Sequence, residues 1–152
     1  SIMIEYWIGV PGIVIAGHKV ASGPSEIYPF GSLEKQIPYF KSLGLNLEAY
    51  HIGTVNISVY PKRWVFKKPE YTFRKVAWTD LHPPEDFSFS ACKITFDSLR
   101  YQGWVYFPHP ETKVRHFQDP SIIEVITEWI QGLQYGSEIL LELKTSEIEI
   151  ME

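Results

Sequence analysis

Apolar and polar residues alternate along several short stretches of the chain, as expected of β-strands with one buried face. In HIGTVNISV, residues 51–59, the apolar positions share one face and leave Thr54 and Asn56 together on the other. Similar runs of β-favouring residues, bounded by Gly, Pro and Asp turn signals, predict strands at residues 2–8, 12–16, 64–66, 72–78, 87–96, 102–107 and 138–144, with 147–151 extending the sheet or fraying. The chain is therefore predicted to be mainly β.

One segment has the features of a helix. Residues 119–132, DPSIIEVITEWIQG, begin with an Asp that can cap a helix, continue with a Pro suited to its first turn and end on a Gly. We predict the one clear helix of the chain here, and a second, short helix around residues 38–43 with Gly44 after it. The clear helix would have Glu124 on its polar side, outside an apolar stripe made of Ile122, Ile123, Ile126, Trp129 and Ile130.

A long irregular segment lies between the predicted strand at residues 12–16 and the short helix. Residues 17–31, GHKVASGPSEIYPFG, contain three glycines and two prolines and have no apolar period. Loops of this length in a compact domain are usually functional. We therefore expect residues 17–31 to contribute to a binding site.

Composition narrows the class of protein. The chain has 152 residues, of which 45% are hydrophobic and 15% aromatic. We therefore expect residues 1–152 to form a single β-rich domain. The net charge of −4 argues against a nucleic-acid partner, whereas a nucleotide needs only a local cluster of donors or a metal. A single cysteine, Cys92, favours a reducing, cytoplasmic setting. No apolar run approaches the length of a membrane span, and no signal peptide is recognisable, so no membrane partner is expected.

Three familiar kinds of site fit the sequence poorly. Residues 12–19, GIVIAGHK, lack the contiguous Gly-Lys-Ser/Thr that opens a helix in a P-loop. His109, Glu111 and His116 follow no defined zinc signature and are expected to be solvated loop residues. The basic and aromatic run at residues 62–75 could stack single-stranded nucleic acid, but on an acidic protein an amphipathic strand pair is favoured.

The Thr54 and Asn56 pair offers a different chemistry. Side chains two residues apart on one strand face stand roughly 7 Å apart at their Cα atoms, so two neutral oxygens could flank one hard cation. Mg²⁺ takes few protein ligands and completes its octahedron with water and phosphate oxygens. Gly53 would let ligand and backbone approach closely. The residues alone still favour the simpler alternative, the polar outer face of an edge strand.

Several segments, taken in order, resemble one enzyme family. The chain resembles the CTP-dependent riboflavin kinases of the archaeal type. The matching segments, in order, are GIVIAG, a glycine-containing loop, PYFKSLGLNLEAYHIGTVNISV, GWVYFP, a His, SIIEVI and GLQYGSEILLEL. The resemblance spans about residues 12–143, and the order of the segments and the Gly-Thr-x-Asn core at residues 53–56 carry it. It implies a small cradle-loop (RIFT-type) β-barrel with one clear and one short α-helix. It also implies a nucleotide-dependent phosphotransferase that converts riboflavin to FMN with Mg²⁺ and with CTP or another nucleoside triphosphate.

The resemblance also assigns roles to individual residues. Thr54 and Asn56 match the family's ligands of the Mg²⁺ that bridges the nucleotide phosphates, and Glu124 matches a Glu near the flavin that would bind it or handle the proton. Trp104 and Tyr106 could wall an aromatic pocket, although burial in the barrel is their expected role. Nucleotide and substrate binding would fall to Gly12, Gly17, His18, Lys19, Ser22, Gly23 and His116.

The sequence departs from the family pattern at the glycine-rich loop. Residues 17–31 replace a tight G-x-G-x-G run with a longer segment, and Gly136-Ser137 stands where the family has Gly-Asp. Two functions therefore remain open, and both involve small-molecule partners. One is the kinase itself; the other is a non-catalytic barrel that has lost the kinase loop and binds a nucleotide, a flavin or a protein. A plain interaction module with a basic-aromatic surface is a third, less favoured alternative.

Overall fold

The computed structural model describes residues 4–16, 32–112 and 119–152. Within these ranges the chain forms nine strands, one α-helix and one short 3₁₀ helix. In order they are β1 Trp7–Ile15, α1 Ser32–Ser42, β2 Val55–Ser58, β3 Arg63–Phe66, β4 Tyr71–Val76, β5 Glu85–Phe96, β6 Leu99–Pro108, the 3₁₀ helix Pro110–Thr112, β7 Ile122–Thr127, β8 Glu138–Lys144 and β9 Ile148–Met151.

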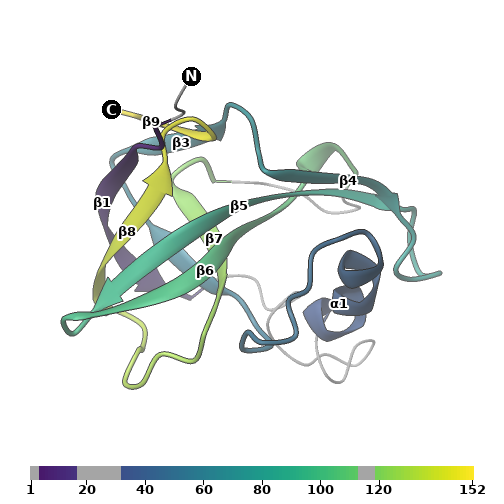
Figure 1. Cartoon of the computed structure of the whole chain (residues 1–152), viewed down its shortest axis with the longest axis horizontal. Coiled ribbons are helices and arrows are strands. Elements are labelled where there is room, and N and C mark those ends of the chain that lie inside the picture. Colours follow the sequence, from purple (N-terminus) through teal and green to yellow (C-terminus); the bar gives the residue numbers. More distant parts are fainter. Residues whose placement is uncertain (1–3, 17–31, 113–118) are drawn as a thin grey trace.

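Six strands close into an antiparallel barrel (Figure 1). Their order is β5–β6–β7–β2–β1–β8, and β8 pairs back with β5 through residues 92–95 of β5. The first half of β5 extends beyond the barrel and pairs with β4. β3 and β9 form a separate two-stranded sheet, from which Trp64 and Ile148 pack against the barrel core. The prediction of a small, mainly β barrel is confirmed.

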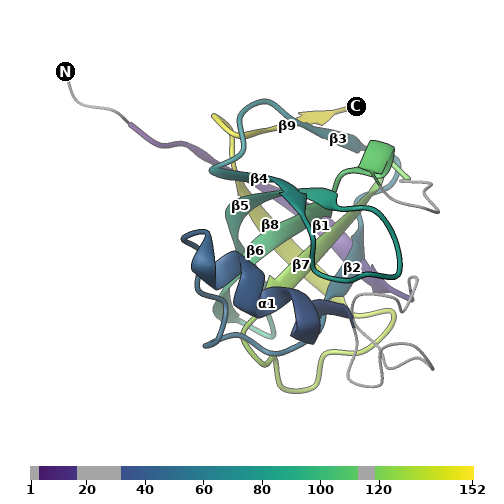
Figure 2. The same cartoon turned by 90° about the vertical axis from the view of Figure 1, so that its right-hand side faces the viewer.

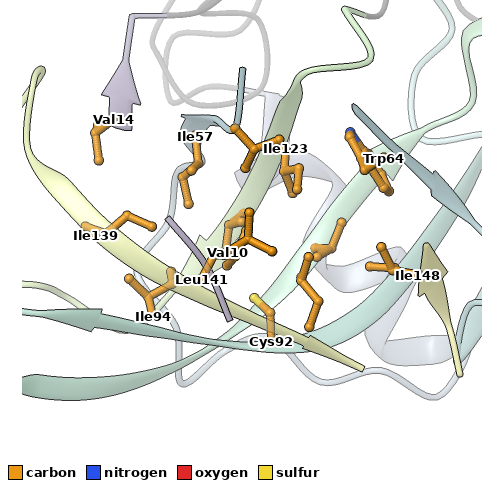
Figure 3. Packing of buried hydrophobic residues seen from close by; sticks show 14 of the residues in the cluster. Val10, Val14, Ile57, Trp64, Cys92, Ile94, Ile123, Ile139, Leu141 and Ile148 are labelled. Atoms are coloured by element: carbon orange, nitrogen blue, oxygen red, sulfur yellow. The ribbon is translucent and has the colours of Figure 1, made fainter. Parts of the chain in front are cut away.

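The barrel interior is filled by alternate, inward-facing residues of all six barrel strands (Figure 3). On β7 these are Ile123 and Val125, and on β2 the inward residue is Ile57, all fully buried. The odd-numbered residues of β7 therefore face inward, and the even-numbered ones face outward. The same alternation gives every barrel strand one face toward the interior and one toward the outside.

Helix α1 lies against the outside of the barrel, across β5, β6 and β7 (Figure 2). Its inward face consists of Leu33, Gln36, Ile37 and Phe40, which recur at helical spacing. Phe40 makes edge-to-face contacts with Phe87 and Phe89 on the outer face of β5. The predicted short helix is confirmed, although it begins at Ser32, six residues earlier than expected.

The predicted helix at residues 119–132 is wrong, because β7 occupies its centre. Five of the six residues in IIEVIT are β-branched, which favours a strand. The barrel core covers the inner face of β7, and residues packed with α1 cover its outer face at Ile126. Because both faces are covered, most of the strand is apolar and shows no alternation. Asp119, expected to cap a helix, instead accepts a hydrogen bond from the Ser121 N–H in a turn.

The first strand also differs from expectation. Residues 2–8 and 12–16 were predicted as two strands separated by a turn at Pro11, whereas the structure has one continuous strand, β1. Its partner β8 pairs with residues 7–13, but β2 begins to pair only at Ile13. β1 is therefore an edge strand on that side at Pro11, and a missing N–H is tolerated there.

Candidate functional site

Thr54, Asn56 and Glu124 lie together on the outside of the barrel. Asn56 on β2 stands directly opposite Glu124 on β7, and both project away from the core because their neighbours Ile57 and Ile123 point inward. The Thr54 hydroxyl donates a hydrogen bond of 2.7 Å to Glu124 Oε2. Two residues that are 70 positions apart in the chain thus form one polar contact. The two strands bring together three of the side chains that the sequence singled out.

The surroundings of Glu124 are partly protein and partly solvent. All three side chains of this oxygen cluster (Thr54, Asn56 and Glu124) belong to half-buried residues. Tyr106 on β6 is buried, and its hydroxyl donates a hydrogen bond of 2.7 Å to Gln36 Oε1 on α1. Burial and then the negative charges of Glu124 and Glu85 raise the pKa of Tyr106 well above its usual range. Glu124 therefore lies at the border between the α1-covered surface and the open outer face.

The oxygen cluster has the donor chemistry of a hard-cation site. A hydroxyl, an amide and a carboxylate offer neutral and charged oxygens, which are the ligands Mg²⁺ accepts. The described residues contain no group of three or more His, Cys, Asp and Glu that could hold a metal by themselves. One carboxylate supplies little charge, so a cation held here would need further anionic oxygens. The phosphates of a nucleotide are oxygens of that kind.

Strand β1 ends beside this cluster. Ile15, the last residue of β1, pairs with Asn56 on β2. The predicted binding residues within the 17–31 segment and near the predicted helix lie outside the described residues: Gly17, His18, Lys19, Ser22, Gly23 and His116.

Gly12, the remaining loop candidate, lies within β1 and is packed against β2. A Cβ atom placed on Gly12 would lie 2.5 Å from Cγ2 of Ile57 and 3.3 Å from the Ser58 carbonyl oxygen. Strand packing therefore requires a glycine at this position. Contact between Gly12 and a nucleotide stays a prediction.

The two aromatic residues named as pocket candidates are packed into the protein. Tyr106 is almost fully buried between the barrel and α1. Trp104 is half-buried, and its indole N–H donates a hydrogen bond of 3.2 Å to the Tyr50 hydroxyl. Both are held by defined partners on the outer face of the barrel.

A second set of polar contacts links Ser88 on β5, His109 just after β6 and Glu111 in the 3₁₀ helix. His109 Nε2 lies 2.7 Å from Ser88 Oγ, and His109 Nδ1 lies 3.0 Å from Glu111 Oε1. The order Ser, His, Glu is that of a hydrolase triad. Only 2% of the surface of Ser88 is exposed, however, and its hydroxyl also contacts Thr72 on β4. A serine so placed cannot reach a substrate, so His109 serves as a hydrogen-bond partner for the buried Ser88 hydroxyl.

Sequence reasoning missed an aromatic pair, Trp129 and His51, that lies in the segments after β7 and before β2. Trp129 had been assigned to the apolar stripe of a helix, yet 65% of its surface is exposed. Its ring meets the ring of His51 at a centroid distance of 5.0 Å and an angle of 65°. The strand character of β7 was the missing signal, because a strand ending at Thr127 leaves Trp129 in the following loop.

Comparison with known proteins adds no relative: no protein-family model and no curated protein matches the chain. Among the described residues, no helix is long and apolar enough to cross a membrane.

Proposed function

We propose that this protein is a Mg²⁺-dependent phosphotransferase of the riboflavin kinase type. It transfers the γ-phosphate of CTP or another nucleoside triphosphate to the 5′-hydroxyl of riboflavin. The observation that best supports this proposal is the oxygen cluster of Thr54, Asn56 and Glu124, which forms beside the end of β1. The buried free thiol of Cys92 fits a reducing, cytoplasmic setting.

Phosphoryl transfer depends mainly on positioning and on charge neutralisation. Thr54 and Asn56 would hold the cation, which would supply positive charge to offset that of the nucleotide phosphates. Glu124 accepts the proton of the attacking hydroxyl as the new P–O bond forms and the bond to the leaving β-phosphate oxygen breaks. The Thr54 hydroxyl fixes one oxygen of the Glu124 carboxylate and so sets the orientation of the other. The products are FMN and a nucleoside diphosphate.

Incubation with riboflavin, Mg²⁺ and each of CTP, ATP, GTP and UTP tests the proposal, with FMN followed by chromatography. The kinase should produce FMN with at least one donor, and chelation of Mg²⁺ should abolish the product. Glu124→Gln should lower kcat by about 10²–10⁴-fold, the usual range for loss of a general base. Thr54→Val and Asn56→Ala should raise the Mg²⁺ concentration needed for half-maximal rate.

Ser58→Ala is the matched control, because Ser58 lies on the same outer face of β2, two residues beyond Asn56. Its rate should equal that of the unchanged protein. If no donor yields FMN, and if riboflavin binding is the same in the Thr54→Val/Asn56→Ala double variant, the kinase is excluded. Nucleotide or flavin binding without turnover would instead favour the non-catalytic barrel.

A further inference from the structure

Hydrogen bonds fix the residues that precede the exposed Trp129. The His51 N–H donates to the Thr127 carbonyl at 3.0 Å, which fastens the segment before β2 to the end of β7. Beside it, Glu128 Oε1 accepts a hydrogen bond of 2.7 Å from the Gln102 N–H of β6. The backbone of β6 and the segment before β2 thus fix the residues just before Trp129. Its exposure is therefore a feature of ordered structure.

The contact between Trp129 and His51 leaves part of the indole available. The angle of 65° between the rings is that of an edge-to-face pair. An edge-on neighbour covers at most one face of an indole, so the other face can stack on a flat ring. Aromatic side chains exposed in this way are the usual platforms on which nucleobases and related heterocycles stack.

The aromatic pair lies near the oxygen cluster in the sequence. Trp129 comes five positions after Glu124, and Thr54 comes three positions after His51. At no more than about 3.6 Å per residue, the Cα atoms of the two pairs lie at most about 18 Å and about 11 Å apart. A small molecule with a polar chain joined to a planar ring spans such distances. Its reacting end would lie at the cluster and its ring on Trp129.

We propose that Trp129, in edge-to-face contact with His51, is the stacking platform for the planar heteroaromatic ring of the substrate whose reacting group lies at the oxygen cluster. This inference rests on the proposed function and names the residue that would select a ring-bearing substrate. The ring belongs either to the flavin or to the nucleotide base, and the two sources are separated by experiment.

Equilibrium dialysis of the whole protein with lumichrome, riboflavin, cytidine and adenosine measures ring binding without phosphate transfer. Lumichrome has the flavin ring without the ribityl chain, and the nucleosides have bases without phosphates. Trp129→Ala should weaken binding of either the flavin pair or the nucleosides about 5- to 150-fold, as expected for loss of one stacking contact. Trp129→Phe should lose less, because it keeps an aromatic face.

Tyr6→Ala is the matched control, since Tyr6 is as exposed as Trp129, at 65%, but belongs to the segment before β1. Its binding should equal that of the unchanged protein. If Trp129→Ala binds every probe as tightly as the unchanged protein, or if the unchanged protein binds none, the platform is excluded. Ring binding that depends on Trp129 without any FMN formation would support the platform and overturn the kinase. FMN formation with unaltered ring binding in Trp129→Ala would support the kinase and exclude the platform.

Discussion

Substituting Gly12 by alanine tests whether this glycine is required for packing or for ligand approach. The added Cβ would lie 2.5 Å from Ile57 Cγ2, 3.3 Å from the Ser58 carbonyl oxygen and 3.5 Å from Ile139 Cδ1. Carbon atoms pack best at about 3.5–4.0 Å, so the contact with Ile57 must open by roughly 1 Å. Ile57 is fully buried and branched at Cβ, so its side chain has few alternative rotamers.

Overpacking of this kind costs about 1–3 kcal/mol in a well-packed core. Replacing a strand glycine by alanine recovers about 0.5–1 kcal/mol of backbone entropy. The net expectation is a loss of up to about 2.5 kcal/mol in the free energy of unfolding. In Gly9→Ala, on the same strand, the new Cβ would meet only the end of the Leu140 side chain, at 3.3 Å, and Leu140 is partly exposed. That variant should be as stable as the unchanged protein or slightly more stable.

Urea denaturation followed by tryptophan fluorescence measures both variants, with the midpoint falling in Gly12→Ala at an unchanged m-value. Ile57→Leu removes the clashing Cγ2 methyl at nearly constant volume. The Gly12→Ala/Ile57→Leu pair should therefore be more stable than the sum of the single changes predicts. If Gly12→Ala is as stable as Gly9→Ala and loses only nucleotide binding, the packing explanation is refuted and the ligand role is favoured.

Three further predictions concern buried or paired groups. Tyr106→Phe removes the donor to the buried Gln36 Oε1, so the free energy of unfolding in urea should fall by about 1–3 kcal/mol. Adding Gln36→Leu should restore much of that loss, and an unchanged urea midpoint in Tyr106→Phe would contradict the prediction. Burial strongly raises the pKa of the Cys92 thiol, so native protein should not react with Ellman's reagent at neutral pH, whereas denatured protein should react fully. The pKa of Glu111 is lowered by hydrogen bonds from the Glu111 backbone N–H and from His109. Glu111→Gln should therefore be slightly less stable than the unchanged protein at neutral pH. That difference should vanish as the pH falls through the lowered pKa, and urea midpoints that differ equally at neutral and acid pH would contradict it.

The parts of the fold that depend on local patterns could be predicted from the sequence. β8 spans residues 138–144 as expected, because EILLELK alternates inward and outward residues without interruption. Between the strands predicted at 87–96 and 102–107, the structure has a two-residue hairpin loop in which Asp97 and Ser98 have φ values of 51° and 67°. Asp tolerates this conformation better than most residues, so the signal was local. The pairing of β5 with β8 that closes the barrel joins residues 45 to 51 positions apart and leaves no such local signal.

β7 shows why local signals can mislead. Asp119 and Pro120 form an ordinary helix-start pattern, and Gly132 an ordinary stop, but the same residues serve equally well in turns. The apolar residues between them fit either period, since a strand covered on both faces has no polar side. The decisive contributions are tertiary: β6 and β2 satisfy the backbone of this strand, and α1 covers Ile126. None of these is encoded within residues 119–132.

The sequence nevertheless predicts correctly that Glu124 faces away from the core. It does so on the basis of a helix, whereas the structure has a strand there. A helix would have set Glu124 apart from an apolar stripe, whereas the strand turns it outward between inward-facing Ile123 and Val125. Only the strand explains the contact with Thr54, because the β2–β7 register places Asn56 opposite Glu124 and Thr54 within hydrogen-bond distance. Ile126, also outward, is buried under α1, while Glu124 is only half-buried. The edge of α1 therefore decides which outward side chains of β7 remain available to a ligand.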